Sequence, residues 1–386
     1  MYLCIKRSEL KPGMYVISHG RGTFDSPFVR VDSVVPYRGE INSLIPPDAE
    51  FVVIDRSKGG VISSAVEALS AATSSTQEDL AVARQLHADA LDYVKQFMED
   101  VRRGTDINFG RAACLVDRFV ESVLRNGTAA VTLFKLRDYD EYTYTHSINV
   151  SILAVLLGKH LGLGKSTLLK LGLAGLLHDA GKEFVPAHIL NKPGKLTDEE
   201  FRVVKAHPLA GYNLLRKQRD IPVDVLQAVL EHHERYDGSG YPRGIRSGSI
   251  GLYSRVLALV DVYDALTSKR VYKAALPPAK ALSLMYSMRD TQFAADDIDN
   301  FIRCIGVFPA GSFVRLSSGE FAVVMSTNPG RPTRPQVKVV LNAELHTIQP
   351  RMLDLETLEG TPQAQDIAEV LNPLDYKLDL ERFLGA

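Results

Sequence analysis

The sequence predicts a mainly α-helical protein, with a helical bundle core flanked by a small N-terminal β domain and a short C-terminal β hairpin or sheet. Three observations favour this class. Apolar residues recur at helical spacing through most of residues 76–304. Short β-branched and aromatic runs, separated by Gly, Pro and Asp, fill the first 55 residues, and the same texture returns after Pro309. The length of 386 residues is enough for two or three domains.

Residues 1–75 are expected to form the small β domain and a linker. The runs KPGMYVIS, SPFVRVDSVV and EFVVID each predict a strand. Residues 57–75 are small and polar, which is typical of a flexible linker. No catalytic constellation is present in this region, so we expect it to act in regulation, substrate gating or dimer contact.

Residues 76–128 are expected to be two connecting helices. A capping box from Thr76 to Asp79 precedes apolar residues that recur at helical spacing as far as Arg103. A second helix is predicted over residues 107–125, and the Asn-Gly pair that follows marks its end.

The rest of the chain divides into residues 129–304, nearly all helical in pattern, and residues 305–386, a β-rich extension and tail. The helical part carries the candidate site and is expected to be the catalytic domain. In the extension, SFVRLSSGEFAVVMS predicts a hairpin that turns near Ser318-Gly319, and QVKVVLN predicts a third strand.

Composition and charge limit the partners and the location. The chain has 45 Lys and Arg against 46 Asp and Glu, a net charge of −1, so we expect no basic footprint for long nucleic acids or anionic membranes. The N-terminus MYLCIKRSEL lacks the apolar core of a signal peptide, and the most apolar runs are too short to span a bilayer. The three cysteines form no CxxC pair, which argues against a thiolate metal site. We therefore expect a cytoplasmic protein.

Two histidines and an aspartate are predicted to be buried in the helical core. His146 starts a stripe that continues through Val150 and Leu153, so its imidazole faces the core. His178 ends STLLKLGLAGLLHD, a helix that is apolar on nearly every side, and Asp179 follows it directly. A buried, unpaired carboxylate is costly, and metal coordination is one of the few arrangements that compensates for it.

Three more histidines and one more aspartate face inward. His232 and His233 follow Val229 by three and four residues, so the pair straddles the buried face and could hold one ion between two rings. His207 lies at the end of a capped helix, and Asp261 lies on the apolar side of RVLALVDVYDAL.

Together these seven side chains favour a site for two divalent metal ions. We expect one ion on His146, His178, Asp179 and Asp261, the second on His207, His232 and His233, and Asp179 as the bridge between them. Mixed nitrogen and oxygen ligands without sulfur suit Fe or Mn, and also Co, Ni or Zn. A satisfied core histidine or a helix-capping aspartate explains any one of these positions alone, but not the whole set on five helices.

Two metal ions roughly 3.5–4 Å apart form a familiar arrangement for hydrolysing phosphate esters. A bridging water that loses its proton at neutral pH would attack phosphorus in line, while the ions absorb charge on the phosphoryl oxygens. Lys182, three residues past Asp179 in HDAGK, is placed to contact that phosphate or to help the leaving oxygen. The alternative for Lys182 is an ordinary lysine at a helix C-terminus, where the helix dipole favours a cation.

These motifs resemble a known family. HDAGK with an upstream His and a downstream Asp resembles the HD phosphohydrolase superfamily, and His207 together with HHERYDGSGYP and DVYDALTSKRVYKAA resembles the HD-GYP family. The resemblance covers residues 130–300 and implies an HD-type helical bundle. Residues 1–55 are also similar to a small N-terminal domain of unknown function that often precedes this family, and the β-rich tail resembles an extension seen in some members.

The resemblance implies a bacterial phosphodiesterase that linearises cyclic di-GMP to pGpG, with slow further hydrolysis to GMP. The two-metal ligands of the family fall on the seven residues above, and its phosphate-contacting lysine falls on Lys182. Tyr241 in the Gly-Tyr-Pro turn would hold an aromatic edge beside the ligand, and Arg270 and Lys273 match guanine- and phosphate-binding positions. An ordinary surface turn and solvated surface charges are the alternatives. For Arg270 to reach the site, its helix must bend or end near Thr267-Ser268.

One departure from the family concerns the number of metals. Some members bind a third metal through a glutamate one helical turn before the first histidine, where this chain has Tyr142. Glu141 is present but is rotated about 100° off that face. We therefore predict two metals rather than three, and slow hydrolysis of pGpG.

Two other functions stay open. The chain could be a binding module that holds the dinucleotide with little turnover and uses the Gly240-Tyr241-Pro242 turn to contact a protein partner. It could instead hydrolyse another cyclic dinucleotide, such as cyclic GMP-AMP. Whether the chain forms a homodimer is a third open point.

Overall fold

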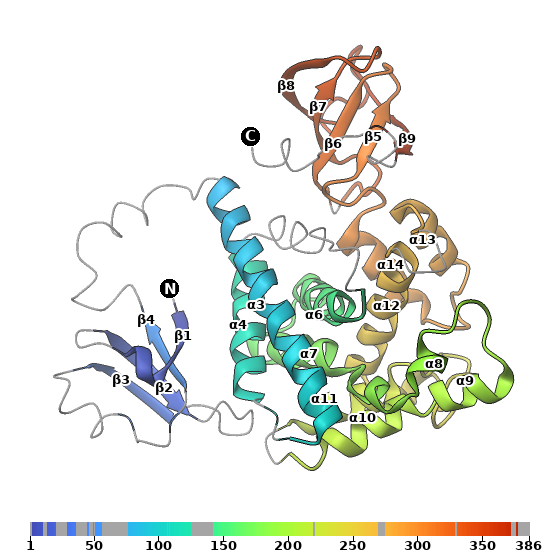
Figure 1. Cartoon of the computed structure of the whole chain (residues 1–386). Helices are drawn as coiled ribbons and strands as arrows, with labels where there is room; N and C mark the ends of the chain where they lie inside the picture. Colours follow the sequence, from blue (N-terminus) through green and yellow to red (C-terminus); the bar gives the residue numbers. More distant parts are fainter. Residues whose placement is uncertain are drawn as a thin grey trace.

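The structure is a computed structural model of the chain (Figure 1). It describes residues 2–10, 14–20, 29–35, 45, 49, 51–55, 76–105, 107, 109–125, 142–218, 221–268, 275–328, 330–371 and 376. Within these residues a helical core is flanked by two antiparallel sheets, one from each end of the chain, which confirms the predicted mainly α-helical class. The predicted linker at residues 57–75 lies outside the described residues.

The N-terminal region forms a four-stranded antiparallel sheet in the order β1-β4-β2-β3. Its strands are β1 (Tyr2–Lys6), β2 (Tyr15–Gly20), β3 (Val29–Val34) and β4 (Phe51–Asp55). The last three overlap the runs predicted to be strands, whereas β1 is an addition that pairs with β4 along its whole length. Val16, Val52 and Ile54 are fully or almost fully buried and make the centre of a small apolar core.

The helical core begins with the two connecting helices and continues through the segment that carries the site. Its longer helices are α3 (Thr76–Arg103), α4 (Phe109–Arg125), α6 (Tyr142–His160), α7 (Lys165–Leu177), α10 (His207–Leu215), α11 (Val223–Glu231), α12 (Leu252–Thr267), α13 (Pro278–Tyr286) and α14 (Ala295–Ile305). The start of α3 and the end of α4 coincide with the predicted boundaries.

At the centre of this core, α6 and α7 pack against each other and are surrounded by α4, α11 and α12. Helices α6 and α7 are apolar on most sides, and other helices therefore bury them on most sides. Their close approach depends on Gly175, since a Cβ at this position would lie 2.7 Å from the Cα of Ser151. The C-terminus of α7, where the site begins, is therefore fixed against α6.

A short irregular segment connects α7 to α10 and covers one side of the site. It contains the 3-10 helix η3 (Ala180–Phe184), α8 (Ala187–Leu190) and α9 (Asp198–Val204). Thr197 and Glu200 form a capping box at the start of α9. A Cβ on Gly181 would lie 2.0 Å from the carbonyl oxygen of His207, so only glycine allows η3 and α10 to meet this closely. The glycine of HDAGK thus brings two candidate ligand segments together.

The C-terminal region forms a five-stranded antiparallel sheet in the order β8-β7-β6-β5-β9. Its strands are β5 (Phe313–Leu316), β6 (Phe321–Ser326), β7 (Gln336–Leu341), β8 (Thr347–Asp354) and β9 (Ile367–Leu371). The hairpin predicted near Ser318-Gly319 is present, and Gly319 has a φ of +88°, which favours glycine. The strand predicted in QVKVVLN is β7, whereas β8 and β9 were not predicted.

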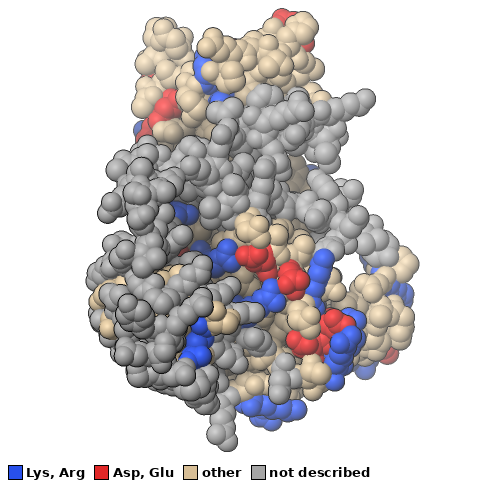
Figure 2. Space-filling model, turned by 60° about the vertical axis from the view of Figure 1, so that its left-hand side comes forward, with Lys and Arg blue, Asp and Glu red and all other residues tan. Residues whose placement is uncertain are grey.

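The surface of the described residues is mixed in charge. Figure 2 shows basic and acidic side chains interspersed over the described part of one face, without a large area of a single sign. In the C-terminal region Arg315, Arg334 and Arg351 each form an ion pair with a carboxylate. Among the described residues, no helix combines the length and the hydropathy that crossing a bilayer requires.

Candidate metal centre

Asp179 lies at the centre of the candidate site, immediately after the end of α7. Its carboxylate is buried, and its two oxygens face different histidines. Oδ2 lies 3.3 Å from Nε2 of His178 and 3.6 Å from Nε2 of His146. Oδ1 lies 3.4 Å from Nε2 of His207 and 4.0 Å from Nε2 of His232. One carboxylate therefore lies between two groups of imidazoles, as a bridging ligand must.

The second aspartate, Asp261 on α12, joins the two groups from the other side. Its Oδ1 lies 3.1 Å from Nε2 of His146, and its Oδ2 lies 3.8 Å from Nδ1 of His233. Ligand atoms within 4.8 Å of one another form three overlapping groups: His207 with His232 and His233, His146 with His178 and Asp179, and His178 with His232 and Asp261. The structure thus brings all seven predicted ligands together from α6, α7, α10, α11 and α12.

Hydrogen bonds at Nδ1 orient four of the five histidines. In His178, His207 and His232, Nδ1 donates to the backbone carbonyl three residues earlier, at a distance of 2.8 Å in each case. Nδ1 of His146 lies 2.7 Å from Oδ2 of Asp264. When Nδ1 donates, Nε2 carries the lone pair and can bind a metal. His233 differs, because its Nδ1 faces Asp261.

Asp264 is a part of the site that the sequence reasoning missed. Its side chain is fully buried, and its Oδ1 accepts hydrogen bonds from Nδ2 of Asn149 and from the hydroxyl of Ser268. It lies three residues after Asp261, so both carboxylates project from one face of α12 toward His146. The spacing Asp-x-x-Asp on a buried helix face is the signal that could have identified it.

Burial and charge set the protonation of the metal-free site. Burial lowers the pKa of His207 to about 3 and that of His233 to about 4, so both are neutral at physiological pH. Burial also lowers the pKa of His232. For His146, burial lowers the pKa, but the hydrogen bonds that the ring donates to the carboxylates of Asp261 and Asp264 outweigh burial and raise the pKa to about 9.

The two ligand aspartates are ionised in spite of their burial. Burial alone would raise the pKa of Asp179, but attraction to His178 and Lys182 holds that pKa well below its ordinary value. Burial would also raise the pKa of Asp261, and its hydrogen bond with His146 overcomes this and lowers the pKa. The site therefore offers buried, ionised carboxylates together with neutral imidazoles at His207, His232 and His233, which are the protonation states that metal ligation requires, whereas His146 carries a proton that a metal would replace.

Two buried polar atoms at the centre of the site show that the residues fit a metal. Among the described residues, Nε2 of His178 and Oδ1 of Asp179 have no hydrogen-bond partner. Leaving such groups unsatisfied in a protein interior is unfavourable, and divalent ions would use both atoms as ligands. The oxygen and nitrogen donors, without sulfur, suit Fe or Mn and also Co, Ni or Zn. Two such ions sharing a carboxylate can hydrolyse phosphate esters.

Lys182 lies beside the bridging carboxylate. Its Nζ is 2.5 Å from Oδ2 of Asp179, and its side chain keeps 25% of its exposure. The lysine therefore points from η3 toward Asp179, and its contact with a substrate phosphate stays a prediction.

The Gly-Tyr-Pro turn lies against the second group of histidines. The centroids of the Tyr241 and His233 rings are 4.8 Å apart. The backbone N–H of Tyr241 donates to the backbone carbonyl of His233 at 3.2 Å. A Cβ on Gly240 would lie 2.5 Å from the Cα of Glu234, so the glycine allows the turn to pack directly on the backbone of the histidine pair. Burial, together with the charges of Asp261 and Asp179, raises the pKa of Tyr241.

Two buried glutamates, which the sequence reasoning missed, hold this turn. The carboxylate of Glu234 accepts the backbone N–H groups of Arg243, Gly244 and Ile245 at 2.7, 3.1 and 3.2 Å. The fully buried Glu231 accepts from the guanidinium of Arg243 at 2.6 Å. Because both flank the histidine pair in sequence, the metal ligands and the turn are fixed to the same piece of backbone.

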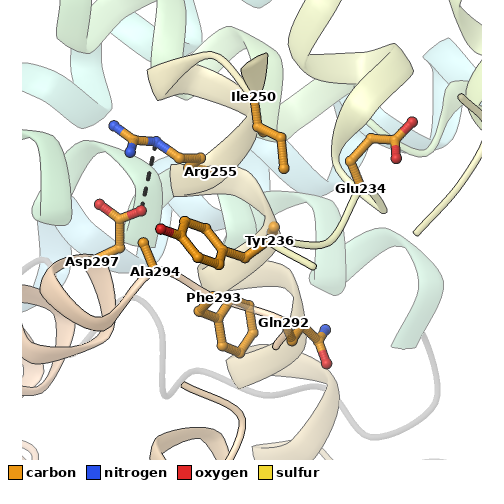
Figure 3. Close-up of a pocket in the computed structure, with 9 residues that line it drawn as sticks. Glu234, Tyr236, Ile250, Arg255, Gln292, Phe293, Ala294 and Asp297 are labelled. Carbon is orange, nitrogen blue, oxygen red and sulfur yellow. Dashed lines mark ion pairs between the residues drawn. The ribbon is translucent and has the colours of Figure 1, made fainter. Parts of the chain in front are cut away.

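Behind the turn lies a small pocket that does not contain any of the seven candidate ligands (Figure 3). Figure 3 shows the ring of Tyr236 between the Arg255–Asp297 ion pair and Gln292. The N–H of Tyr236 donates to the carbonyl of Gln292 at 3.1 Å. This pocket therefore marks where the turn is anchored to the segment before α14.

Several predicted residues fall outside the described part of the chain. Arg270 and Lys273 lie there, and so does Glu141. Helix α6 begins at Tyr142, whose side chain is also not described. Helix α12 ends at Thr267, which agrees with the expectation that it ends before Arg270. The assignments of Arg270 and Lys273 to the substrate and the expected absence of a third metal stay predictions.

Comparison with known proteins places this site in a family. Residues 132–296 match the HD domain, residues 2–112 match a domain of unknown function (DUF3391), and residues 313–377 match a KOW domain associated with the HD domain. A cyclic di-GMP phosphodiesterase of Pseudomonas aeruginosa is 37% identical over 350 residues, which cover 87% of this chain and 84% of the relative.

Other relatives match the helical core more locally. The cyclic di-GMP phosphodiesterase response regulator RpfG of Xanthomonas campestris is 44% identical over 40% of this chain and 41% of its own length. A 3'3'-cGAMP-specific phosphodiesterase of Vibrio cholerae is 40% identical over 37% of this chain and 31% of its own length. An HDG"Y"P protein from Bdellovibrio bacteriovorus shares the fold, with a TM-score of 0.51 and 15% identity over 78% of this chain and 98% of that chain. The chain therefore belongs to the HD-GYP family of HD-domain phosphohydrolases.

Proposed function

We propose that the protein is a metal-dependent phosphodiesterase that hydrolyses cyclic di-GMP to linear pGpG. The observation that carries this proposal is the position of Asp179, with one oxygen directed at each group of imidazoles. The relatives from Pseudomonas aeruginosa and Xanthomonas campestris are named for the same substrate. We further propose that the enzyme acts in the cytoplasm. Residues 129–304 would form its catalytic domain. The N-terminal β domain with its linker (1–75) and the connecting helices (76–128) would precede it, and the β-rich extension (305–386) would follow it.

The proposed centre holds two divalent ions, Fe or Mn in preference to Co, Ni or Zn. The first ion would use His146, His178, Asp179 and Asp261, and the second would use His207, His232, His233 and the shared Asp179. Bound ions supply Lewis acidity toward the phosphodiester and lower the pKa of a water at neutral pH. Neutral imidazoles at His207 and His233 keep their lone pairs available for this at pH 7.

Residues of the chain position the substrate around this centre. Lys182 places a cation beside Asp179, where it can contact a phosphoryl oxygen and stabilise charge on the leaving oxygen. Tyr241 forms an aromatic wall next to His233, against which a nucleotide base can stack. Glu234 keeps that wall in place through the backbone of the turn. Arg270 and Lys273 are proposed to bind guanine and phosphate.

The proposal is tested by hydrolysis of cyclic di-GMP with protein reconstituted with Mn or Fe, followed by chromatographic analysis of the products. The expected result is pGpG, with slow appearance of GMP and no turnover by Asp179→Ala. Protein that carries two metals and binds cyclic di-GMP, but never cleaves it, would contradict the proposal. That outcome would favour a binding module that uses the Gly240-Tyr241-Pro242 turn as a contact for a protein partner.

Cyclic GMP-AMP is the second candidate substrate, because one relative from Vibrio cholerae is named for 3'3'-cGAMP and is 40% identical over 37% of this chain. Rates measured side by side with cyclic di-GMP and cyclic GMP-AMP distinguish the two. A higher kcat/KM for cyclic GMP-AMP would retain the metal centre and the reaction while changing the substrate.

A further inference from the structure

A lysine outside the metal centre lies on the outer edge of the Tyr241 wall. Lys205 follows the last residue of α9, and its Nζ is 5.2 Å from the centre of the Tyr241 ring and 4.7 Å from that of Phe201. The two rings are 6.5 Å apart and nearly perpendicular. The aromatic wall therefore extends from His233 through Tyr241 to Phe201. The ammonium group of Lys205 contacts the rings of both Tyr241 and Phe201.

The arrangement is fixed by the start of α9. The capping box of Thr197 and Glu200 sets the direction of the helix, and Nζ of Lys192 holds the carboxylate of Glu200 at 2.7 and 2.8 Å. At the other end of α9, Lys205 is only half-buried and Phe201 keeps 43% of its exposure. An exposed aromatic ring and a cation beside a substrate wall form a surface that is ready to bind a ligand.

Within the described residues Lys205 differs from the other cations near the site. Lys182 is paired with Asp179, and Arg243 is paired with the buried Glu231. No ion pair joins Lys205 to a carboxylate in the described part of the chain, and its charge contacts aromatic faces instead. Its positive charge is therefore available to an anion that lies over Tyr241.

The chemistry of a cyclic dinucleotide supplies such an anion. The molecule contains two phosphodiesters on opposite sides of its ring, and only one of them can be at the metal centre at a time. The other carries a full negative charge and must lie farther along the wall. We propose that Lys205 binds this second, non-scissile phosphate and that Phe201 positions the lysine. This inference rests on the proposed function, because it assumes a substrate with two phosphates.

The test compares Lys205→Gln with Arg202→Gln on two substrates. Arg202 is a matched control because it lies in the last turn of the same helix, its side chain is 73% exposed, and its partner is Glu199. Cyclic di-GMP has the second phosphate, whereas bis(p-nitrophenyl) phosphate has a single one. Both variants remove one positive charge from the end of α9, so general effects on the helix are the same.

We expect Lys205→Gln to raise the KM for cyclic di-GMP about ten-fold with a smaller change in kcat, since one charge-assisted contact is lost from binding. The KM for bis(p-nitrophenyl) phosphate should rise much less in this variant. Raising the salt concentration should increase KM more steeply in the wild type than in the variant. Lys205→Arg should restore most of the affinity, and Arg202→Gln should behave as the wild type on both substrates.

Two results would overturn the inference and can be told apart. If the wild type cleaves cyclic di-GMP and Lys205→Gln has the same KM as Arg202→Gln, the inference is wrong and the proposed function stands. If the wild type neither cleaves nor binds cyclic di-GMP, the proposed function fails and the inference fails with it. Where the wild type binds without cleaving, calorimetric titration replaces KM by Kd, and the same ten-fold expectation applies.

Discussion

The two halves of the candidate metal centre contain similar candidate ligands in different electrostatic environments. The half around His146 contains Asp261 and is supported by Asp264, and these carboxylates raise the pKa of His146 to about 9. The half around His207 consists of imidazoles, and burial lowers the pKa of His207 to about 3. Asp179 faces imidazoles of both halves, and Asp261, which lies nearest His146, also approaches His233 from the other side.

If each half holds one ion, as proposed above, this difference makes the two ion sites inequivalent. The carboxylate-rich half carries more negative charge and holds a proton until a metal replaces it. The imidazole half has no proton to lose at neutral pH, but it depends on Asp179 for negative charge. We therefore expect the two ions to bind with different affinity and different pH dependence.

The largest effect is expected when the shared ligand is removed. Asp179→Asn should lower kcat/KM by more than the roughly 10–100-fold typical for the loss of an outer partner of a metal ligand, because both halves lose a ligand. Elemental analysis should show fewer than two metals per chain. Asp224→Asn is the matched control, since that aspartate is exposed, pairs with Lys170 and is not one of the candidate ligands. An Asp179→Asn protein with two tightly bound metals would contradict the bridging role.

Removing a ligand from one half should be more selective. His207→Ala should leave one metal per chain, held by the half around His146, with little activity because a dinuclear centre needs both ions. Metal titration of the purified variant, followed by hydrolysis at saturating metal, checks this. A variant that still binds two metals would show that His207 belongs to the core packing rather than to the centre.

Removing the carboxylate of Asp264 should weaken metal binding only in the half around His146. Asp264→Asn is expected to weaken binding of one metal by about 10–100-fold and to leave the other unchanged, because Nδ1 of His146 loses its carboxylate partner. Competition with a chelator at graded concentrations measures the two affinities separately. Equal weakening of both metals would mean that Asp264 acts through general stability, which thermal unfolding of the variant would reveal.

Proton release should distinguish the halves without any mutation. The pKa of His146 is raised above its ordinary value, so the metal-free ring is protonated at pH 7.5 and must lose that proton when a metal binds. His207 and His233 have lowered pKa values and are already neutral. Calorimetry in buffers of different ionisation enthalpy should find about one proton more released at pH 7.5 than above pH 9, in addition to any proton lost by a metal-bound water. No release at pH 7.5 would contradict this assignment.

The smallest expected effect concerns the turn rather than the metals. Glu234→Gln should raise the KM for cyclic di-GMP by about three- to ten-fold, since an amide satisfies the three backbone N–H groups less well than a carboxylate. The metal content should stay at two per chain. Loss of metal in this variant would show that the turn and the histidine pair cannot be separated.

The sequence predicted which side chains would gather at the candidate site, because most of them follow from local periodicity. His207 is an exception, since it was expected at the end of the helix that begins at Thr197 but is the first residue of α10. His146, Asp261 and the pair His232 and His233 lie on the apolar faces of their own helices, which the spacing of apolar residues makes visible. Asp179 follows a helix so apolar that its end must be buried. The clustering of these positions follows from the packing of α6, α7, α11 and α12 around one centre.

What the sequence did not predict depends on contacts between segments. Glu231 and Glu234 look like surface glutamates in HHERYDGSGYP, and only the return of the chain buries them under Arg243. Lys205 and Phe201 were not predicted to lie near the site, because their contacts with Tyr241 join segments that are distant in the sequence. Strands β1, β8 and β9 were missed because short strands are identified by their partners more than by their own composition.

The central claim is tested most directly by anomalous diffraction from crystals of the Mn-loaded protein. The account predicts two peaks roughly 3.5–4 Å apart, one on each side of the Asp179 carboxylate, with His178 on one and His207 on the other. One peak, three peaks, or two peaks without Asp179 between them would contradict it.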